Sequence, residues 1–183
     1  MALLPEWSGK GKRKNNLFPV RARFELMFET TLRPGTLDKL SVPEHWAPGE
    51  RVIRIEAPDD KEGYERPIPL TERARKALER VAPAAGVIFG EHKYHRYLRP
   101  AAEAVLSKGK SAVFCGQHTR SAAITRALER SSNLAGVMHL AGHKHASTTS
   151  KYVRPTFRAA LDVISAFDSG EVSGENPKRR ATK

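Results

Sequence analysis

The sequence predicts a mainly α-helical domain with one small β-hairpin, an α+β fold. Apolar residues recur at helical spacing in several segments, beginning with "PVRARFELMFETTL" from Pro19. One segment, "RVIRIEA", instead alternates apolar and polar residues at period two, as a half-buried strand does. At 183 residues the chain is long enough for one domain with a substantial core and short for two.

The predicted elements follow the breaks in these patterns. "RPGT" ends the first helix, and "TLDKLSVPEHW" predicts a short helical turn with an irregular exit. "RVIRIEA" and "YERPIPL" flank turn-forming residues, which predicts a hairpin with its tip near Asp59 to Gly63. Thr71 is expected to cap the next helix and Pro83 to stop it. The remaining helices are expected in "GEHKYHRYLRPAAEAVLSKGK" (ending in a Lys/Gly loop), over 117–130, in "SNLAGVMHLAGH", over 146–153 and in "PTFRAALDVISAFD".

The charge of the chain indicates a polyanionic partner. Lys and Arg number 32 against 20 Asp and Glu, a formal net charge of +12. Such a surplus favours nucleic acid. An anionic membrane surface and a ribosomal or histone-like packing role are the competing explanations. No long apolar run or basic amphipathic anchor supports the membrane.

Cysteine usage and the two ends of the chain add further expectations. Cys115 is the single cysteine, so no intrachain disulfide can form, which fits a cytoplasmic location. Residues 1–18 are expected to form a flexible basic arm. Residues 169–183 have little apolar surface to bury and are expected to be disordered.

The segment "GHKHASTTSKYVRP" is the most distinctive of the chain. It places one tyrosine, Tyr152, at the end of a run of basic and hydrogen-bonding residues. A packed ring with a satisfied hydroxyl is one explanation. The other is that the phenol oxygen acts on a negatively charged group held there.

Four motifs resemble those of one known family. In chain order they are "TTLRPGTLDKL", "DDKEGYERPIPL", "HTRSAAITRALE" and "LAGHKHASTTSKYVRP". Their order and internal spacing resemble the catalytic domain of the tyrosine recombinases, the phage integrase family, from about Leu4 to Ser165. The resemblance implies that family's catalytic-domain fold over residues 19–168. It also implies DNA strand cleavage through a 3′-phosphotyrosyl link with a free 5′-hydroxyl, without metal or nucleotide cofactor.

The resemblance assigns a role to each matching residue. Tyr152, nine positions after His143, matches the nucleophile. Because a phenol has an ordinary pKa of about 10, it needs positive charge or a proton acceptor nearby to attack phosphorus. Arg33 and Arg120 match the two arginines that grip the phosphate oxygens, and His143 matches a histidine that hydrogen-bonds the phosphate. Lys61, at the hairpin tip, matches the general acid for the departing 5′ oxygen.

Two positions depart from the family pattern. Gln117 stands three residues before Arg120, where the family usually has histidine, and His118 follows it. Either Gln117 supplies only a hydrogen-bond donor, or His118 reaches the site through a local shift. Thr36 stands where an acidic residue is common after Arg33, at a position that mostly supports its neighbours.

The expected partner is double-stranded DNA, bound in a basic cleft. Family members carry a further N-terminal domain, which this chain is expected to lack. We therefore expect a homotetramer on DNA for a full-length protein and a monomer without that domain. The alternatives are a DNA-binding module with an impaired site and a type IB topoisomerase-like enzyme. A metal site is not expected, because no carboxylate or cysteine completes a ligand set around His92 and His95.

Overall fold

The computed structural model describes residues 3–8, 17–155 and 157–168. The chain divides into two compact units, with the boundary between Val153 and Arg154. The helices of the first unit are α1 (Val20–Thr30), α2 (Pro34–Lys39), α3 (Glu72–Glu79), α4 (His95–Glu103), α5 (Lys108–Ala112), α6 (Gly116–Ser131), α7 (Leu134–Ala141) and α8 (Ala146–Ser150). Its strands are β1 (Ser41–Val42), β2 (Val52–Ile55), β3 (Arg66–Pro69) and β4 (Gly86–Val87), with a 3₁₀ turn, η2, over Ala57–Asp59. The second unit contains α9 (Phe157–Asp168).

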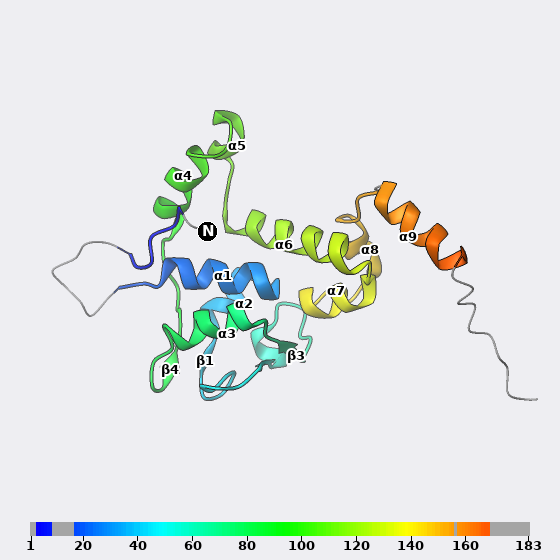
Figure 1. Ribbon diagram of the computed structural model, residues 1–183. Helices are drawn as coiled ribbons and strands as arrows, with labels where there is room; N and C mark the ends of the chain where they lie inside the picture. The colour runs from blue at the N-terminus through cyan, green and yellow to red at the C-terminus, as the bar shows by residue number, and fades with distance from the viewer. Residues whose placement is uncertain (1–2, 9–16, 156, 169–183) are drawn as a thin grey trace, which may run out of the picture. The chain divides into compact units, whose positions relative to one another are not determined.

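Helix α1 is the centre of the first unit, where it contacts both α3 and α6 (Figure 1). Its side chains are buried on more than one face, among them Phe24, Leu26 and Met27. The helix ends where Thr31 adopts a left-handed conformation, at φ 58°, and donates its N–H to the carbonyl of Met27. Pro34 then starts α2, so Arg33 lies at the junction of two helices.

The predicted hairpin is confirmed. Strands β2 and β3 pair antiparallel with Ile53 opposite Ile68, and alternate residues of each strand are buried. The connection between them contains η2 and a turn in which Gly63 has a φ of 59°. This turn carries Lys61.

Three details differ from the sequence expectations. The pairing of β1 with β4 was not predicted, because each strand has only two residues and shows no period-two pattern. The expected Lys/Gly loop after α4 forms the short helix α5 instead, with the Ser111 hydroxyl bonded to the carbonyl of Lys108. Helix α3 ends at Glu79, before Pro83, whereas its predicted cap is confirmed by the 3.2 Å bond from the Ala74 N–H to Thr71 Oγ1.

The described part of the expected N-terminal arm packs on the domain. Leu4 and Phe18 are buried, because their apolar side chains join the main core. The Phe18 N–H donates to Ser8 Oγ at 2.8 Å, and Arg21 donates to the carbonyl of Leu4. The rest of that arm, residues 9–16, and the expected disordered tail, 169–183, lie outside the described residues.

The mainly helical fold class is confirmed, and the last predicted helix is present as α9. It begins two residues after Pro155. None of the helices in the described ranges is both long and apolar enough to cross a bilayer.

Candidate active site

Arg33 is oriented by two segments distant from it in the sequence. Its Nη1 lies 3.2 and 3.3 Å from the two carboxylate oxygens of Asp60, on the hairpin turn. Its Nη2 donates to the carbonyl oxygen of Gly142 at 3.3 Å and lies 3.6 Å from Glu62 Oε1. The side chain is 18% exposed, so it is partly accessible to solvent.

Arg120 is fully buried in the first part of α6. Its Nη1 donates to the carbonyl of Thr31 and its Nη2 to that of Ala141, so it joins the ends of α1 and α7. Burial, reinforced by the positive charge of Arg33, lowers the pKa of Arg120 to about 10. The group therefore stays protonated at neutral pH.

His143 follows Gly142, whose left-handed conformation ends α7. Its Nε2 lies 3.2 Å from Nη2 of Arg120, and its Nδ1 lies 2.9 Å from Oγ1 of Thr149. Because an arginine can only donate, Nε2 accepts this bond and the ring proton is assigned to Nδ1. Burial, and then the charges of Arg120 and Arg33, lower the pKa of His143 to about 4, so the ring is neutral at pH 7.

Tyr152 lies just beyond α8, with its backbone N–H bonded to the carbonyl of Thr149 at 3.0 Å. Its ring is stacked on that of His143, with centroids 6.3 Å apart and planes 17° apart. The half-buried ring also packs on a small apolar cluster formed by α6 and α7. A negative charge on Tyr152 acts to raise the pKa of Arg120, so the two groups are within electrostatic reach.

Asp60, Arg66 and Gly142 also belong to this site, and sequence reasoning missed all three. The Asp60 and Arg66 side chains are both 0% exposed and form an ion pair at 2.9 Å. Burial alone would raise the pKa of Asp60, but the Glu62 N–H and Arg66 outweigh it and lower that pKa. Arg66 could have been found from the alternation of side chains along β3. It lies two residues before the buried Ile68, so both side chains face the core.

Lys61 and Gln117 are not brought into contact with this group. Lys61 is exposed between Asp60 and Glu62, and within the described residues its ammonium forms no hydrogen bond or ion pair. Gln117 is exposed in the first turn of α6, and its side chain likewise bonds to no described residue.

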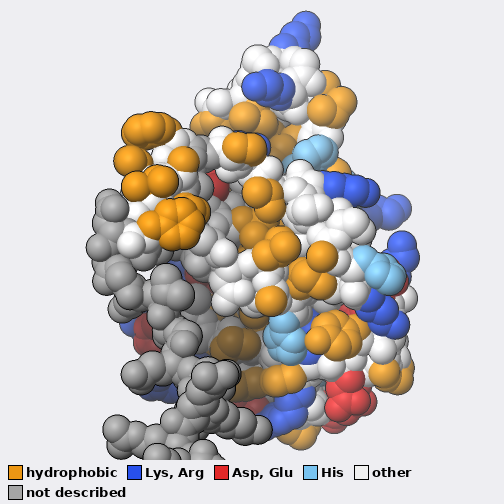
Figure 2. All heavy atoms as spheres, turned by 90° about the vertical axis from the view of Figure 1, so that its right-hand side faces the viewer, with side chains coloured by type: hydrophobic (Ala, Val, Ile, Leu, Met, Phe, Trp, Pro, Cys, Tyr) orange, Lys and Arg blue, Asp and Glu red, His pale blue; other side chains and the backbone are white. Residues whose placement is uncertain are grey.

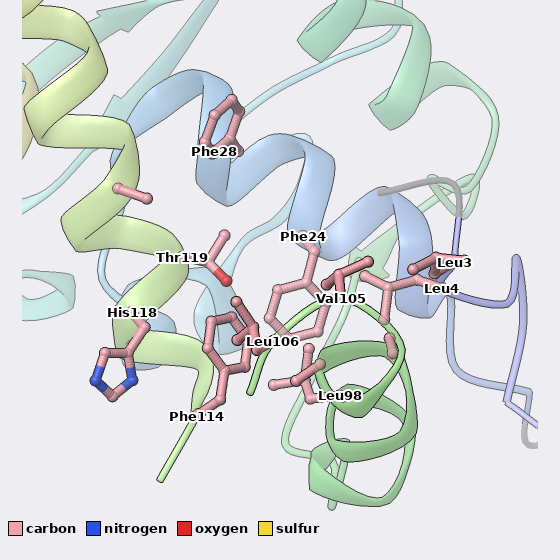
Figure 3. Close-up of a pocket in the computed structure, with 13 residues that line it drawn as sticks. Leu3, Leu4, Phe24, Phe28, Leu98, Val105, Leu106, Phe114, His118 and Thr119 are labelled. Carbon is pink, nitrogen blue, oxygen red and sulfur yellow. The ribbon is translucent and has the colours of Figure 1, made fainter. Parts of the chain in front are cut away.

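His118 has a different role from the one considered for it. Its Nδ1 accepts the Cys115 N–H at 3.1 Å and so caps α6, while its ring stacks on Phe114. Figure 3 shows it at the edge of a largely apolar pocket between α1, α4 and α6. The local shift that would bring His118 to the phosphate is therefore not observed. Thr36 supports its neighbours as expected, because its buried hydroxyl donates to the carbonyl of Asp59 at 3.1 Å.

Basic side chains gather on one part of the surface. On the face in Figure 2, Lys, Arg and His side chains follow one edge beside exposed apolar groups.

In the described ranges, no three His, Cys, Asp or Glu side chains are grouped to hold a metal ion. His92 instead stacks on Phe18, with ring centroids 4.3 Å apart.

The Phage integrase family matches residues 10–158, which is most of the chain. The chain belongs to this family. No curated protein matches the sequence.

Solved structures show the same fold. The Tn1549 transposon integrase in complex with a circular intermediate DNA is 18% identical, with a TM-score of 0.60. The similarity covers 79% of this chain and 57% of that one, so this chain spans a little over half of its length. The XerA recombinase is 16% identical, with a TM-score of 0.56 over 80% of this chain and 58% of its own. The catalytic domain of the bacteriophage HP1 integrase is 15% identical, with a TM-score of 0.57 over 80% of this chain and 82% of its own.

The buried, neutral His143 makes the free energy of unfolding depend on pH. Its pKa of about 4 in the folded chain lies below the ordinary 6.5, so the unfolded chain binds the proton first. This contribution is full above pH 6.5 and is lost as the pH falls toward 4, a decrease of up to about 3 kcal/mol. We expect the free energy of unfolding of the His143→Gln variant to lack this pH-dependent contribution. Urea unfolding of both proteins from pH 7 to 4 measures it, and parallel stability curves would contradict it.

Gly142 is expected to tolerate no side chain. A Cβ there would lie 2.4 Å from Nη2 of Arg66, and the φ of 63° is itself unfavourable for alanine. Gly142→Ala should lower the free energy of unfolding by on the order of 3 kcal/mol. Gly109→Ala is the control, because nothing lies within 4 Å of its added Cβ. Equal melting temperatures for the two variants would show that the packing of Arg66 on Gly142 is not tight.

Proposed function

We propose that residues 19–168 form the catalytic domain of a recombinase that cuts and rejoins DNA strands through Tyr152. The observation that carries the proposal is the convergence of Arg33, Arg120 and His143 beside the ring of Tyr152. These four residues come from three separate segments of the chain, and the fold brings them to one place. A group of cationic side chains next to a phenol suits attack on a phosphodiester.

The two arginines suit stabilisation of the transition state. When a nucleophile adds to phosphorus, negative charge grows on the non-bridging oxygens, and guanidinium groups bind such oxygens in fixed directions. Arg120 remains charged with its pKa of about 10, and the Arg33 side chain is partly accessible to solvent. Because both are held by backbone carbonyls, little reorganisation is needed when the phosphate arrives.

The reaction follows from these positions. The half-buried Tyr152 hydroxyl gives up its proton to solvent, its oxygen bonds to phosphorus, and the bond from phosphorus to the 5′ oxygen breaks. Lys61 supplies the proton to that departing oxygen, for which the exposed turn must bring its ammonium to the DNA. Since the phosphotyrosyl ester retains the energy of the phosphodiester, a 5′-hydroxyl can reverse the step and rejoin a strand.

Gln117 rather than His118 is proposed to take the position of the family histidine. It lies three residues before Arg120 on α6, hence on the same side of the helix, and its amide is free to donate to a phosphate oxygen. His118 is engaged in the helix cap.

The proposed partner is duplex DNA, reached in the cytoplasm. The net charge of +12 supports it, and the structure of the similar Tn1549 transposon integrase is a complex with DNA. We propose that the protein acts as a homotetramer on DNA. A DNA-binding module without cleavage is the second candidate, favoured by the exposed Lys61 and by Gln117 in place of histidine.

Tyr152→Phe should abolish covalent attachment to DNA while leaving binding intact, because only the attacking oxygen is removed. Labelled duplexes of random sequence with a single nick, denatured in SDS, show the adduct as a shifted band. Tyr97→Phe, at another half-buried tyrosine, should still form the adduct. No adduct with the wild-type chain would favour the binding module, and relaxation of supercoiled plasmid without site preference would favour a topoisomerase.

Glu62 is expected to compete with DNA for Arg33. Its half-exposed carboxylate lies 3.6 Å from Arg33 Nη2, where it partly neutralises the charge available to a phosphate. Glu62→Gln should therefore raise the affinity for duplex DNA by about 2- to 5-fold. Glu65→Gln makes the same charge change at an exposed position of the same hairpin. Equal gains in fluorescence-anisotropy titrations of the two variants would mean that only the net charge matters.

A further inference from the structure

A single buried carboxylate joins the parts of this site that lie far apart in the sequence. Asp60 accepts hydrogen bonds from three groups: the Arg33 guanidinium at 3.2 and 3.3 Å, the Arg66 guanidinium at 2.9 Å and the Glu62 N–H at 2.9 Å. Its side chain is 0% exposed. Every strong interaction of this carboxylate therefore lies inside the fold.

Arg66 connects Asp60 to Gly142, because it pairs with the first and packs on the second. The Arg66 side chain is 0% exposed, and its Nε and Nη2 have no hydrogen-bond partner among the described residues. Its guanidinium packs so closely on Gly142 that a Cβ there would meet three of its atoms within 2.6 Å. Gly142 is the residue before His143, and its carbonyl accepts from Arg33.

We infer that Asp60 is the positioning residue of this site: it holds Arg33 directly, and it sets the Gly142–His143 backbone through Arg66. The inference rests on the proposed function. Asp60 also precedes Lys61 in the chain, so the same contact anchors the base of the turn that carries the proposed general acid.

Such a residue is needed because the positively charged arginines of the site repel one another. Arg33, Arg66 and Arg120 all lie in a largely solvent-free region, where charges interact more strongly than in water. An arginine side chain is long and rotatable, so an unpaired Arg33 would turn toward solvent or toward Glu62. With its Nη1 held by Asp60, Arg33 keeps its remaining donors directed at one position.

Asp60→Asn should slow cleavage rather than weaken binding. Displacement of a catalytic guanidinium by about 1 Å is expected to reduce the single-turnover rate by on the order of 10²-fold, while the loss of a negative charge leaves the Kd for DNA equal or lower. Asp59→Asn is the matched control, since Asp59 pairs instead with His45 and Lys39. A fall in DNA affinity with an unchanged cleavage rate would overturn the inference.

A second pair of variants separates positioning from stability. Asp60→Asn alone leaves Arg66 buried without a counter-charge and can prevent folding. In Asp60→Asn/Arg66→Met the buried pair is removed as a unit, which proteins often tolerate. The double variant should fold, as judged by its melting temperature, yet still cleave on the order of 10²-fold more slowly. If it cleaves at the wild-type rate, Asp60 serves only to neutralise Arg66 and the inference is wrong.

A double-mutant cycle tests whether Asp60 acts through Arg33. In an Arg33→Ala background, the change Asp60→Asn/Arg66→Met should reduce the cleavage rate clearly less than in the wild-type background, because one of the two groups that Asp60 positions is already absent and only the Gly142–His143 backbone is still affected. A further loss as large as in the wild-type background would contradict the inference.

Nitrogen-15 NMR of the guanidinium groups gives a readout that needs no DNA. We expect slow rotation for Arg33 in the wild-type chain and fast rotation in the double variant, with exposed Arg51 as the reference for free rotation. Rotation of wild-type Arg33 as fast as that of Arg51 would overturn the inference whether or not the protein cuts DNA. Slow rotation without any covalent adduct would support the role of Asp60 and count against the proposed function alone.

Discussion

The site depends on holding several guanidinium groups close together with little water between them. Arg66 and Arg120 are fully buried, and Arg33 is only 18% exposed. In such a region, uncompensated charge is costly. The fold offsets it with one buried carboxylate and with backbone carbonyls, and the positive charge that remains makes the site suitable for a phosphate.

The carbonyls that hold these arginines come from the C-terminal ends of helices. Thr31 follows α1, and Ala141 and Gly142 end α7. The last carbonyls of a helix lack partners within it and carry partial negative charge. Arg120 and Arg33 donate to them, so each satisfies an otherwise open acceptor while being fixed in direction. The same environment keeps His143 neutral, which lets its Nε2 accept from Arg120.

Much of the site was predictable because its chemistry requires particular residue types at short spacings. Arg33, Arg120, His143 and Tyr152 lie in motifs whose internal distances are local, and the fold brings all four together. Asp60 and Gly142 were missed because their roles arise from contacts with residues distant in the chain. His118 was considered for the phosphate, but the cap of α6, a local hydrogen bond, takes its imidazole instead.

The mainly helical class, the hairpin, the charge and the four motif residues could be predicted from the sequence, because periodicity and local spacing are properties of neighbouring residues. The tertiary structure alone decided that Asp60 and Arg66 form a buried pair, that Arg66 packs on Gly142, and that Lys61 stays exposed. Those outcomes depend on which surfaces meet when α6, α7 and the hairpin turn pack together. Burial and the neighbouring charges together then set the charge state of each group, as the neutral His143 shows.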